Sequence, residues 1–138
     1  MKEGVYPARV VDVAELLDTL GVRTPLAFDA PTVIAYHDAC HLSHGQGIRH
    51  APRRLLSRIA NVTVVELADE EMCCGSAGLY NLEHPTTAAD LGRRKAEAIR
   101  ATSAQMVATG NIGCLMQIET HLEGIPVRHT IEVLNSAF

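Results

Sequence analysis

Aromatic residues are scarce in this chain, which has no tryptophan and only 4% aromatic residues among its 138. The core must therefore be built from valine, leucine, isoleucine and alanine, and a chain of this length suits a single core. No apolar run approaches the roughly 20 residues that a membrane-spanning helix requires. The first ten residues, MKEGVYPARV, also lack the apolar segment of a secretory signal peptide. These absences predict a cytoplasmic domain without a membrane-spanning segment, in which thiols stay reduced.

Concentrated positive charge is absent as well. The net charge is −4, and the 12 lysines and arginines are scattered along the sequence. This distribution excludes a nucleic-acid-binding stripe and a basic membrane-binding patch. Apolar residues make up 47% and charged residues 20%, which is typical of a globular domain rather than of a disordered chain.

Short apolar segments alternate with amphipathic ones along most of the sequence. The predicted strands span residues 32–36, 62–67, 105–108 and 126–128, and the predicted helices span residues 10–20, 52–59, 85–103, 114–122 and 130–134. Residues 1–31 are expected to hold the N-terminal helix and an irregular connector. Strands that alternate with helices favour right-handed crossovers between parallel strands. We therefore predict an α/β fold, a three-layer open sheet of about four mainly parallel strands with helices on both faces.

The four cysteines are too few for a disulfide scaffold, and in a reduced compartment they indicate metal binding or redox chemistry. Cys40 follows the first predicted strand, Cys73 and Cys74 follow the second, and Cys114 follows the third. The carboxyl ends of parallel strands meet at one edge of a sheet, where α/β proteins bind ligands. We therefore expect the four cysteines to converge, although 32 residues separate the first from the pair and 39 separate the pair from the last.

Thiolates are the preferred ligands of iron–sulfur clusters and also bind zinc. The adjacent Cys73 and Cys74 do not readily form a disulfide with each other, but both can ligate a cluster with more than one iron. Gly75 and the small residues after it allow backbone N–H groups to approach a bound sulfide. Cysteines also serve as small buried hydrophobic residues. That interpretation would hold for a single cysteine, and we disfavour it for four at one sheet edge.

Four blocks of the sequence resemble a known family. They read YHDACHLSHGQGI (36–48), EEMCCGSAGLYNLEHP (70–85), NIGCLMQI (111–118) and RHTIEVL (128–134). Together they resemble the cysteine-rich CCG domain of heterodisulfide reductase subunits, anaerobic glycerol-3-phosphate dehydrogenase and the glycolate oxidase iron–sulfur subunit, most of all the C-terminal domain of the last. The resemblance implies that residues 32–138 are a CCG domain. Since the ferredoxin-like motifs of the full-length subunits are missing, it also implies a C-terminal fragment of a longer subunit.

The resemblance implies a set of cluster ligands, which carry over onto Cys40, Cys73, Cys74 and Cys114. The expected cofactor is an iron–sulfur cluster of the 4Fe–4S type, with zinc as a substitute. The heterodisulfide reductase branch ends in Cys-x-x-Cys, whereas Gln117 stands at the last position here, so the five-cysteine cluster of that branch is not expected. We expect the Gln117 amide to lie near the metal site, because residues i and i+3 share a helix face.

Some of the seven histidines lie close to these cysteines. We expect His37 and His129 to hydrogen-bond the cluster sulfurs rather than to ligate metal, and we group them with Gly75 and Gln117 as cofactor-binding residues. His41 flanks Cys40 and is a further candidate for such a bond. The others are expected to be structural or solvated: His44, His50, His84 and His121.

The glycines Gly45 and Gly47 suggest a dinucleotide-binding loop, but two features exclude one. The sixth position of the motif is His50 instead of glycine, and eight residues separate Tyr36 from Gly45. A pyrophosphate-binding loop follows its strand directly. We therefore expect no flavin or nicotinamide site on this chain.

The resemblance implies an electron-transfer domain of a glycolate oxidase-type complex, without catalytic residues of its own. Electrons would come from a flavin-containing partner subunit and pass towards a quinone or another acceptor. Other iron–sulfur domains of the full-length subunit are further expected partners, and the complex would lie in the cytoplasm or peripherally at the inner membrane. Two alternatives stay open: a structural zinc site, and a thiol enzyme that reduces disulfides as heterodisulfide reductase does.

Overall fold

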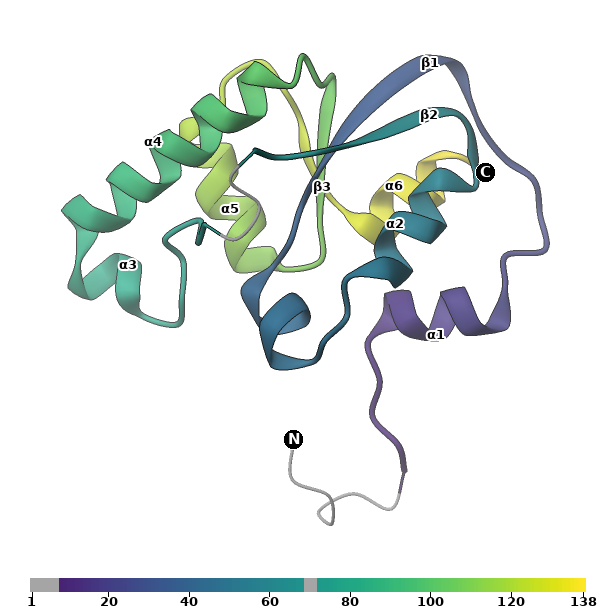
Figure 1. Cartoon of the computed structure of the whole chain (residues 1–138), viewed down its shortest axis with the longest axis horizontal. Coiled ribbons are helices and arrows are strands. Elements are labelled where there is room, and N and C mark those ends of the chain that lie inside the picture. The colour runs from purple at the N-terminus through teal and green to yellow at the C-terminus, as the bar shows by residue number, and fades with distance from the viewer. Residues whose placement is uncertain (1–7, 69–71) are drawn as a thin grey trace.

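The computed structural model describes residues 8–68 and 72–138 and shows a parallel sheet between two layers of helices (Figure 1). The strands are β1 (Leu26–His37), β2 (Ile59–Glu66), β3 (Met106–Thr109) and β4 (Val127–His129). The helices are α1 (Val13–Leu20), α2 (His50–Ser57), α3 (Tyr80–Glu83), α4 (Pro85–Ala101), α5 (Ile112–His121) and α6 (Thr130–Ser136), and a single π-helical turn, η1, spans His41–Gly45.

The strand order is β2-β1-β3-β4, and every neighbouring pair is parallel. Helix α2 connects β1 to β2 on one side, whereas α4 and α5 carry the chain in the opposite direction across the sheet. The direction of the connections therefore reverses between β1 and β3. In open α/β sheets, the crevice at such a reversal, beyond the carboxyl ends of the strands, is where ligands bind. The predicted fold class is confirmed.

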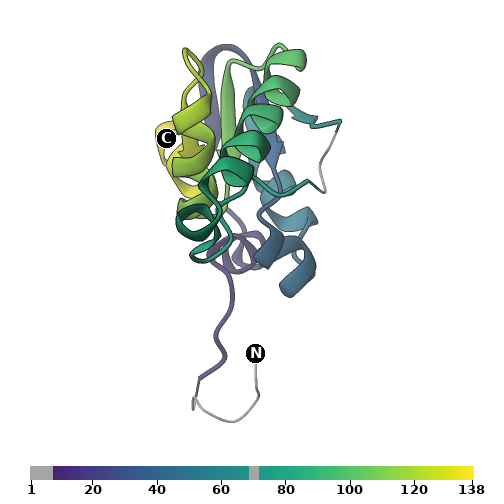
Figure 2. The same cartoon turned by 90° about the vertical axis from the view of Figure 1, so that its left-hand side faces the viewer.

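Two helical layers cover the sheet. Helices α4 and α5 pack against each other on one face, and α1, α2 and α6 form the other layer. Figure 2, in which α4 faces the viewer, shows α5 alongside it. Successive side chains of β1 serve the two layers in turn, because strand side chains alternate in direction: Ala35 belongs to the core beneath α4 and α5, whereas Ile34 and Tyr36 belong to the core beneath α1, α2 and α6.

The irregular connector predicted within residues 1–31, after the N-terminal helix, is partly wrong, since β1 begins at Leu26. Leu26 and Ala27 pair with the start of β2, the register then shifts, and regular pairing resumes at Thr32. Pro31 lies in this irregular stretch, where a residue without a backbone N–H is tolerated. The division of the chain at residues 31 and 32 into a connector and a domain stays a prediction.

Helix α1 begins where Asp12 accepts a hydrogen bond from the backbone N–H of Ala14, and it ends at Gly21 with a φ of 76°. Helix α4 begins at Pro85, which suits a first turn. The short helix α3 and the turn η1 were not predicted, because segments of four or five residues are too short to show helical periodicity. Within the described part of the chain, none of the helices has the length and apolar character needed to cross a bilayer.

Candidate metal centre

The cysteines stand at the carboxyl edge of the sheet, on three different connections. Cys40 follows β1 and immediately precedes η1, Cys73 and Cys74 lie between β2 and α3, and Cys114 lies in the first turn of α5. All four are free thiols: Cys40 is exposed, Cys73 is half-buried, and Cys74 and Cys114 are buried. The chain thus reaches one place from three strand ends.

A cavity at this edge is lined by all four cysteines. Its lining consists of His37, Asp38, Cys40, Ser43, His44, Met72, Cys73, Cys74 and Cys114. It lies by β1 and β3, where the direction of the connections reverses. The sequence predicted this convergence of the cysteines from the order of strands and loops alone, and the structure places them together. Their role as metal ligands stays a prediction.

Three side chains at this cavity form a compact donor group. The ring nitrogen of His37 and the sulfurs of Cys74 and Cys114 all lie within 4.8 Å of one another, and all three residues are buried. The His37 side chain is 1% exposed, and its Nδ1 atom finds no hydrogen-bond partner among the described residues. An unpaired buried ring nitrogen is unfavourable unless a ligand completes its bonding. Two cysteine sulfurs and an imidazole nitrogen are the donor chemistry that a thiophilic metal takes, so the site fits a metal centre.

The sulfurs of Cys74 and Cys114 compete for one proton. Their mutual hydrogen bond lowers the pKa of Cys74 to about 4, against the effect of burial and with further help from hydrogen bonds to His37 and the Ser76 backbone. The same hydrogen bond, together with burial and the neighbouring sulfurs, raises the pKa of Cys114. The hydrogen bond therefore favours ionisation of Cys74 over that of Cys114. A metal that displaces the protons of both sulfurs would gain two anionic ligands.

Burial raises the pKa of the Cys73 thiol, although the backbone N–H of Gly75 donates a hydrogen bond to its sulfur over 3.3 Å. This donor is of the kind expected from the glycine after the cysteine pair, because backbone N–H groups stabilise anionic sulfur. Gly75 has a φ of 94°, and a Cβ atom there would lie 2.7 Å from the carbonyl oxygen of Ala88. Both the conformation and the close packing against α4 require glycine.

Asn111 fixes the backbone around Cys114. It is the N-cap of α5, and its Oδ1 accepts a hydrogen bond from the backbone N–H of Cys114 over 3.0 Å. Its Nδ2 lies 3.4 Å from the Nδ1 of His41, which joins the start of α5 to the η1 turn after Cys40. This role of Asn111 was not predicted from the sequence. An asparagine three positions before a cysteine at a helix start is the signal that could have revealed it.

Gln117 contacts α4 and does not line the cavity. Its Nε2 donates a hydrogen bond over 2.9 Å to the carbonyl oxygen of Ala88, the same atom that packs against Gly75. The amide therefore holds in place the carbonyl oxygen against which Gly75, next to the Cys73–Cys74 pair, is packed. A direct contact between Gln117 and a bound cofactor stays a prediction.

His129 caps a helix. Its Nδ1 accepts a hydrogen bond from the backbone N–H of Ile131 over 3.3 Å, and Glu132 completes the capping box by accepting from the His129 N–H. Residue 129 is thus placed beside Thr109 at the carboxyl edge, but it is not among the residues that line the cavity. Its expected contact with the cofactor is untested.

His44 does line the cavity. Its Nδ1 lies 3.4 Å from the Nη2 of Arg49, which immediately precedes α2. From the sequence, this histidine was expected to be structural or solvated. Asp38 and Ser43 also line the cavity and were not singled out as site residues. Both lie within a few residues of Cys40 in the sequence, and this closeness could have identified them as site residues.

An α/β domain in which four cysteines line one cavity at the switch point of a parallel sheet belongs to the broad class of cysteine-rich domains. The cysteine-rich domain family CCG matches residues 34–119, more than half of the chain. The chain belongs to this family, as the four sequence blocks predicted.

Curated relatives are similar over most of this chain. Lactate utilization protein A of Oceanobacillus iheyensis is 33% identical over 125 residues, which cover 88% of this chain and 51% of the relative. The glycolate oxidase iron-sulfur subunit of Escherichia coli is 35% identical over 130 residues, which cover 92% of this chain and 30% of the relative. The probable glycolate oxidase iron-sulfur subunit of Bacillus subtilis is 36% identical over 98 residues, 71% of this chain and 22% of the relative. The chain spans about half the length of these relatives, or less.

Proposed function

We propose that this chain binds an iron–sulfur cluster through Cys40, Cys73, Cys74 and Cys114 and acts as an electron-transfer domain. The observation that carries the proposal is the convergence of these cysteines, from three strand ends, on one cavity. Relatives named as iron–sulfur subunits of glycolate oxidase in two bacteria support the choice of cofactor.

The surrounding residues have distinct tasks in this proposal. A bound cluster would accept and release single electrons. Cys74 and Cys114 would supply buried sulfur ligands, of which Cys74 has the lowered pKa, and the Gly75 N–H would stabilise the sulfur of Cys73. We propose that His37 hydrogen-bonds a cluster sulfur, since its Nδ1 is buried and lacks a partner among the described residues. Gln117 and His129 would act from the periphery of the site, through the contacts they make with Ala88 and with α6.

The relatives that are named as subunits support the proposal of a partner subunit. We propose a flavin-containing subunit as the electron donor, a quinone or another acceptor beyond this domain, and a cytoplasmic complex that is at most peripheral to the inner membrane. Further iron–sulfur domains would lie in the remaining length of a longer subunit. The 4Fe–4S type of cluster is part of the same proposal.

Metal analysis of the anaerobically purified protein tests this function. We expect a brown protein that contains iron and acid-labile sulfide, and we expect both Cys73→Ser and Cys74→Ser to lose them. Ser57→Ala, at an exposed serine of α2, serves as the control. Full cluster retention in both cysteine variants would refute the assignment of the site.

A single zinc ion is the second candidate, because the donor atoms of His37, Cys74 and Cys114 lie within 4.8 Å of one another. Donors on one tetrahedral ion are this close together, whereas the thiolates around a larger cluster are spread further apart. Zinc would make the protein colourless and its role structural. Stoichiometric zinc without iron or sulfide after anaerobic purification would support this candidate.

The burial of Cys74 and Cys114 disfavours the third possibility, a thiol enzyme, since a nucleophilic thiolate needs access to its substrate. Alkylation of the purified protein tests this point. We expect the two buried thiols to react only after the metal is removed by a chelator. Rapid alkylation of Cys74 in the metal-loaded protein would favour the thiol enzyme.

The chain is not expected to oxidise glycolate or lactate by itself. That reaction removes two electrons and a hydrogen from carbon, which requires an organic cofactor such as a flavin. We expect no dye reduction when the cluster-loaded protein is mixed with either acid, and reduction when a matching flavoprotein is added. Turnover without the flavoprotein would place the active site on this chain.

A further inference from the structure

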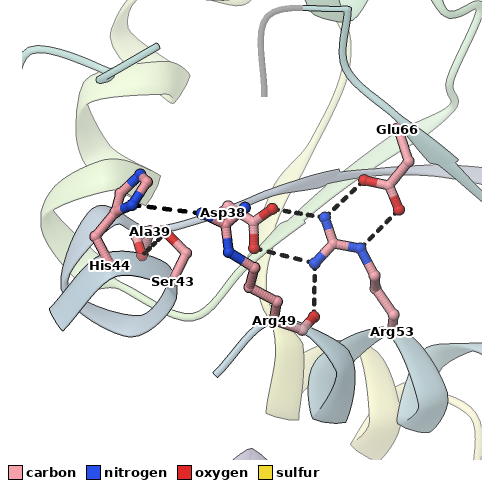
Figure 3. A network of polar contacts seen from close by, with 7 residues as sticks. All are labelled: Asp38, Ala39, Ser43, His44, Arg49, Arg53 and Glu66. Atoms are coloured by element: carbon pink, nitrogen blue, oxygen red, sulfur yellow. Dashed lines mark hydrogen bonds and ion pairs between the residues drawn. The ribbon is translucent and has the colours of Figure 1, made fainter. Parts of the chain in front are cut away.

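The guanidinium of Arg53 uses all five of its N–H donors close to the metal cavity (Figure 3). Its Nη1 and Nη2 donate to the two carboxylate oxygens of Asp38 over 3.0 and 2.6 Å. Its Nε and Nη2 donate to the two oxygens of Glu66, both over 2.6 Å, and Nη1 also donates to the carbonyl oxygen of Arg49 over 2.6 Å. Arginine is the one side chain that can satisfy two carboxylates bidentately in this way.

The two carboxylates belong to different strand ends. Asp38 directly follows β1 and lines the metal cavity two residues before Cys40. Glu66 is the last residue of β2, from which the chain continues to Cys73, and it pairs in register with Tyr36 of β1. Arg53 itself comes from α2 and lies 4.7 Å above the Tyr36 ring. The guanidinium therefore joins the ends of the two strands whose loops carry three of the four cysteines.

Asp38 depends on Arg53 more than Glu66 does, because Asp38 is buried. Its side chain is 5% exposed, whereas that of Glu66 is 48% exposed. A buried carboxylate without its partner is strongly unfavourable, and this carboxylate lines the same cavity as the four cysteines. By binding both Asp38 oxygens, Arg53 neutralises this charge and keeps a hard oxygen donor away from a site built of sulfur.

We infer that Arg53 is a positioning residue of the metal centre. It fixes the Cys40 loop relative to the Cys73–Cys74 loop, and it keeps the carboxylate of Asp38 from binding the metal. This inference rests on the proposed metal-binding function. The adjacent Arg54 offers a contrast: it pairs with Asp18 of α1, its side chain is 58% exposed, and it is not among the residues that line the cavity.

Cobalt(II) binding to the metal-free chain tests the inference, because sulfur-to-cobalt charge-transfer absorption reports thiolate ligation without an oxygen-sensitive cluster. We expect Arg53→Met to weaken cobalt binding about tenfold or more, as loss of a residue that orients metal ligands does. We also expect its absorption spectrum to shift as the Asp38 oxygen replaces a sulfur ligand. Arg54→Met is the matched control and should retain wild-type affinity and spectrum.

The outcomes separate this inference from the function on which it rests. Absence of thiolate-to-cobalt absorption in the wild type would refute the metal centre itself. A wild type that binds cobalt while Arg53→Met matches Arg54→Met in affinity and spectrum would overturn only the positioning role, even if the metal-free variant unfolds at a lower temperature. If Arg53→Met does not fold, Arg53→Lys decides: weaker cobalt binding supports the inference, and wild-type binding overturns it.

Discussion

The two faces of the sheet differ in what their cores contain. The core beneath α1, α2 and α6 is built of aliphatic residues and Tyr36, and includes Ile34, Leu55 and Leu134. The core beneath α4 and α5 begins with similar residues, such as Val107 and Ile118, but at the carboxyl edge it continues into Cys74 and Cys114. Strands β1, β2 and β3 serve both cores, since neighbouring residues on a strand point to opposite faces.

The two cores therefore contribute differently: one mainly stabilises the fold, and the other also carries the candidate metal site. An aliphatic core gains free energy from burial alone, so the α1–α2–α6 face can hold the sheet together without a cofactor. The other face ends in two buried cysteines that share a hydrogen bond, Cys74 and Cys114, and in the Nδ1 of His37, which has no partner among the described residues. A bound metal would satisfy such groups. Substitutions on the two faces should therefore have different consequences.

The largest effect is expected from Cys114→Ala on the α4–α5 face. Removal of this sulfur leaves too few ligands at the site, so we expect loss of bound iron, measured after anaerobic reconstitution. The metal-free variant should unfold at nearly the wild-type temperature, because the small side chain contributes little to the core. A variant that still binds iron at wild-type stoichiometry would show that Cys114 is only a core residue.

Leu55→Ala breaks the opposite face. Leu55 is fully buried, and its truncation should lower the free energy of unfolding by about 2–5 kcal/mol through lost burial and the cavity left behind. Denaturant unfolding of the metal-free protein measures this loss. Leu20→Ala, at a side chain that is 68% exposed, is the control and should change it by less than about 0.5 kcal/mol. We expect folded Leu55→Ala protein to bind metal normally, and a lost site would show that the faces are not independent.

Gly75→Ala sharpens the comparison within one loop. The added methyl group would meet the Ala88 carbonyl oxygen at 2.7 Å in a backbone with a φ of 94°, so we expect about 1–3 kcal/mol of destabilisation and weaker metal binding. Gly78→Ala is the control: its φ is also positive, at 56°, but nothing lies within 4 Å of the added methyl group. Equal metal affinities in the two variants would mean that contact with Ala88 does not position the cysteine pair.

The smallest effect is expected from Gln117→Ala. It removes one hydrogen bond to the Ala88 carbonyl oxygen, which should cost about 0.5–1.5 kcal/mol of unfolding free energy. Iron should be retained, as in the neighbouring control Met116→Ala at an exposed position. Complete loss of iron from the Gln117 variant alone would identify this side chain as a ligand.

Local sequence features were sufficient for most of the fold. Apolar periodicity located the four strands and the long helices. The largest error is the start of β1: its first residues pair with β2 in a register that differs from that of the rest of the strand. Such pairing depends on a partner strand that is distant in the sequence and leaves no local signal, as Leu26 and Ile59 show. The convergence of the four cysteines was predictable because parallel topology brings strand ends to one edge.

The sequence by itself determined the class of fold, the edge at which the cysteines meet and the family to which the chain belongs. Each of these follows from residue order: strands alternate with helices, and a cysteine follows each of the first three strands. Tertiary structure alone decided which side chains from other elements lie around those sulfurs. Arg53 binds Asp38 and Glu66, which lie at the ends of two strands. Gln117 of α5 binds the Ala88 carbonyl oxygen of α4, against which Gly75 packs. Hydrogen bonds and ion pairs act only over a few ångströms, so such contacts exist only once the packed helices have placed the side chains in space.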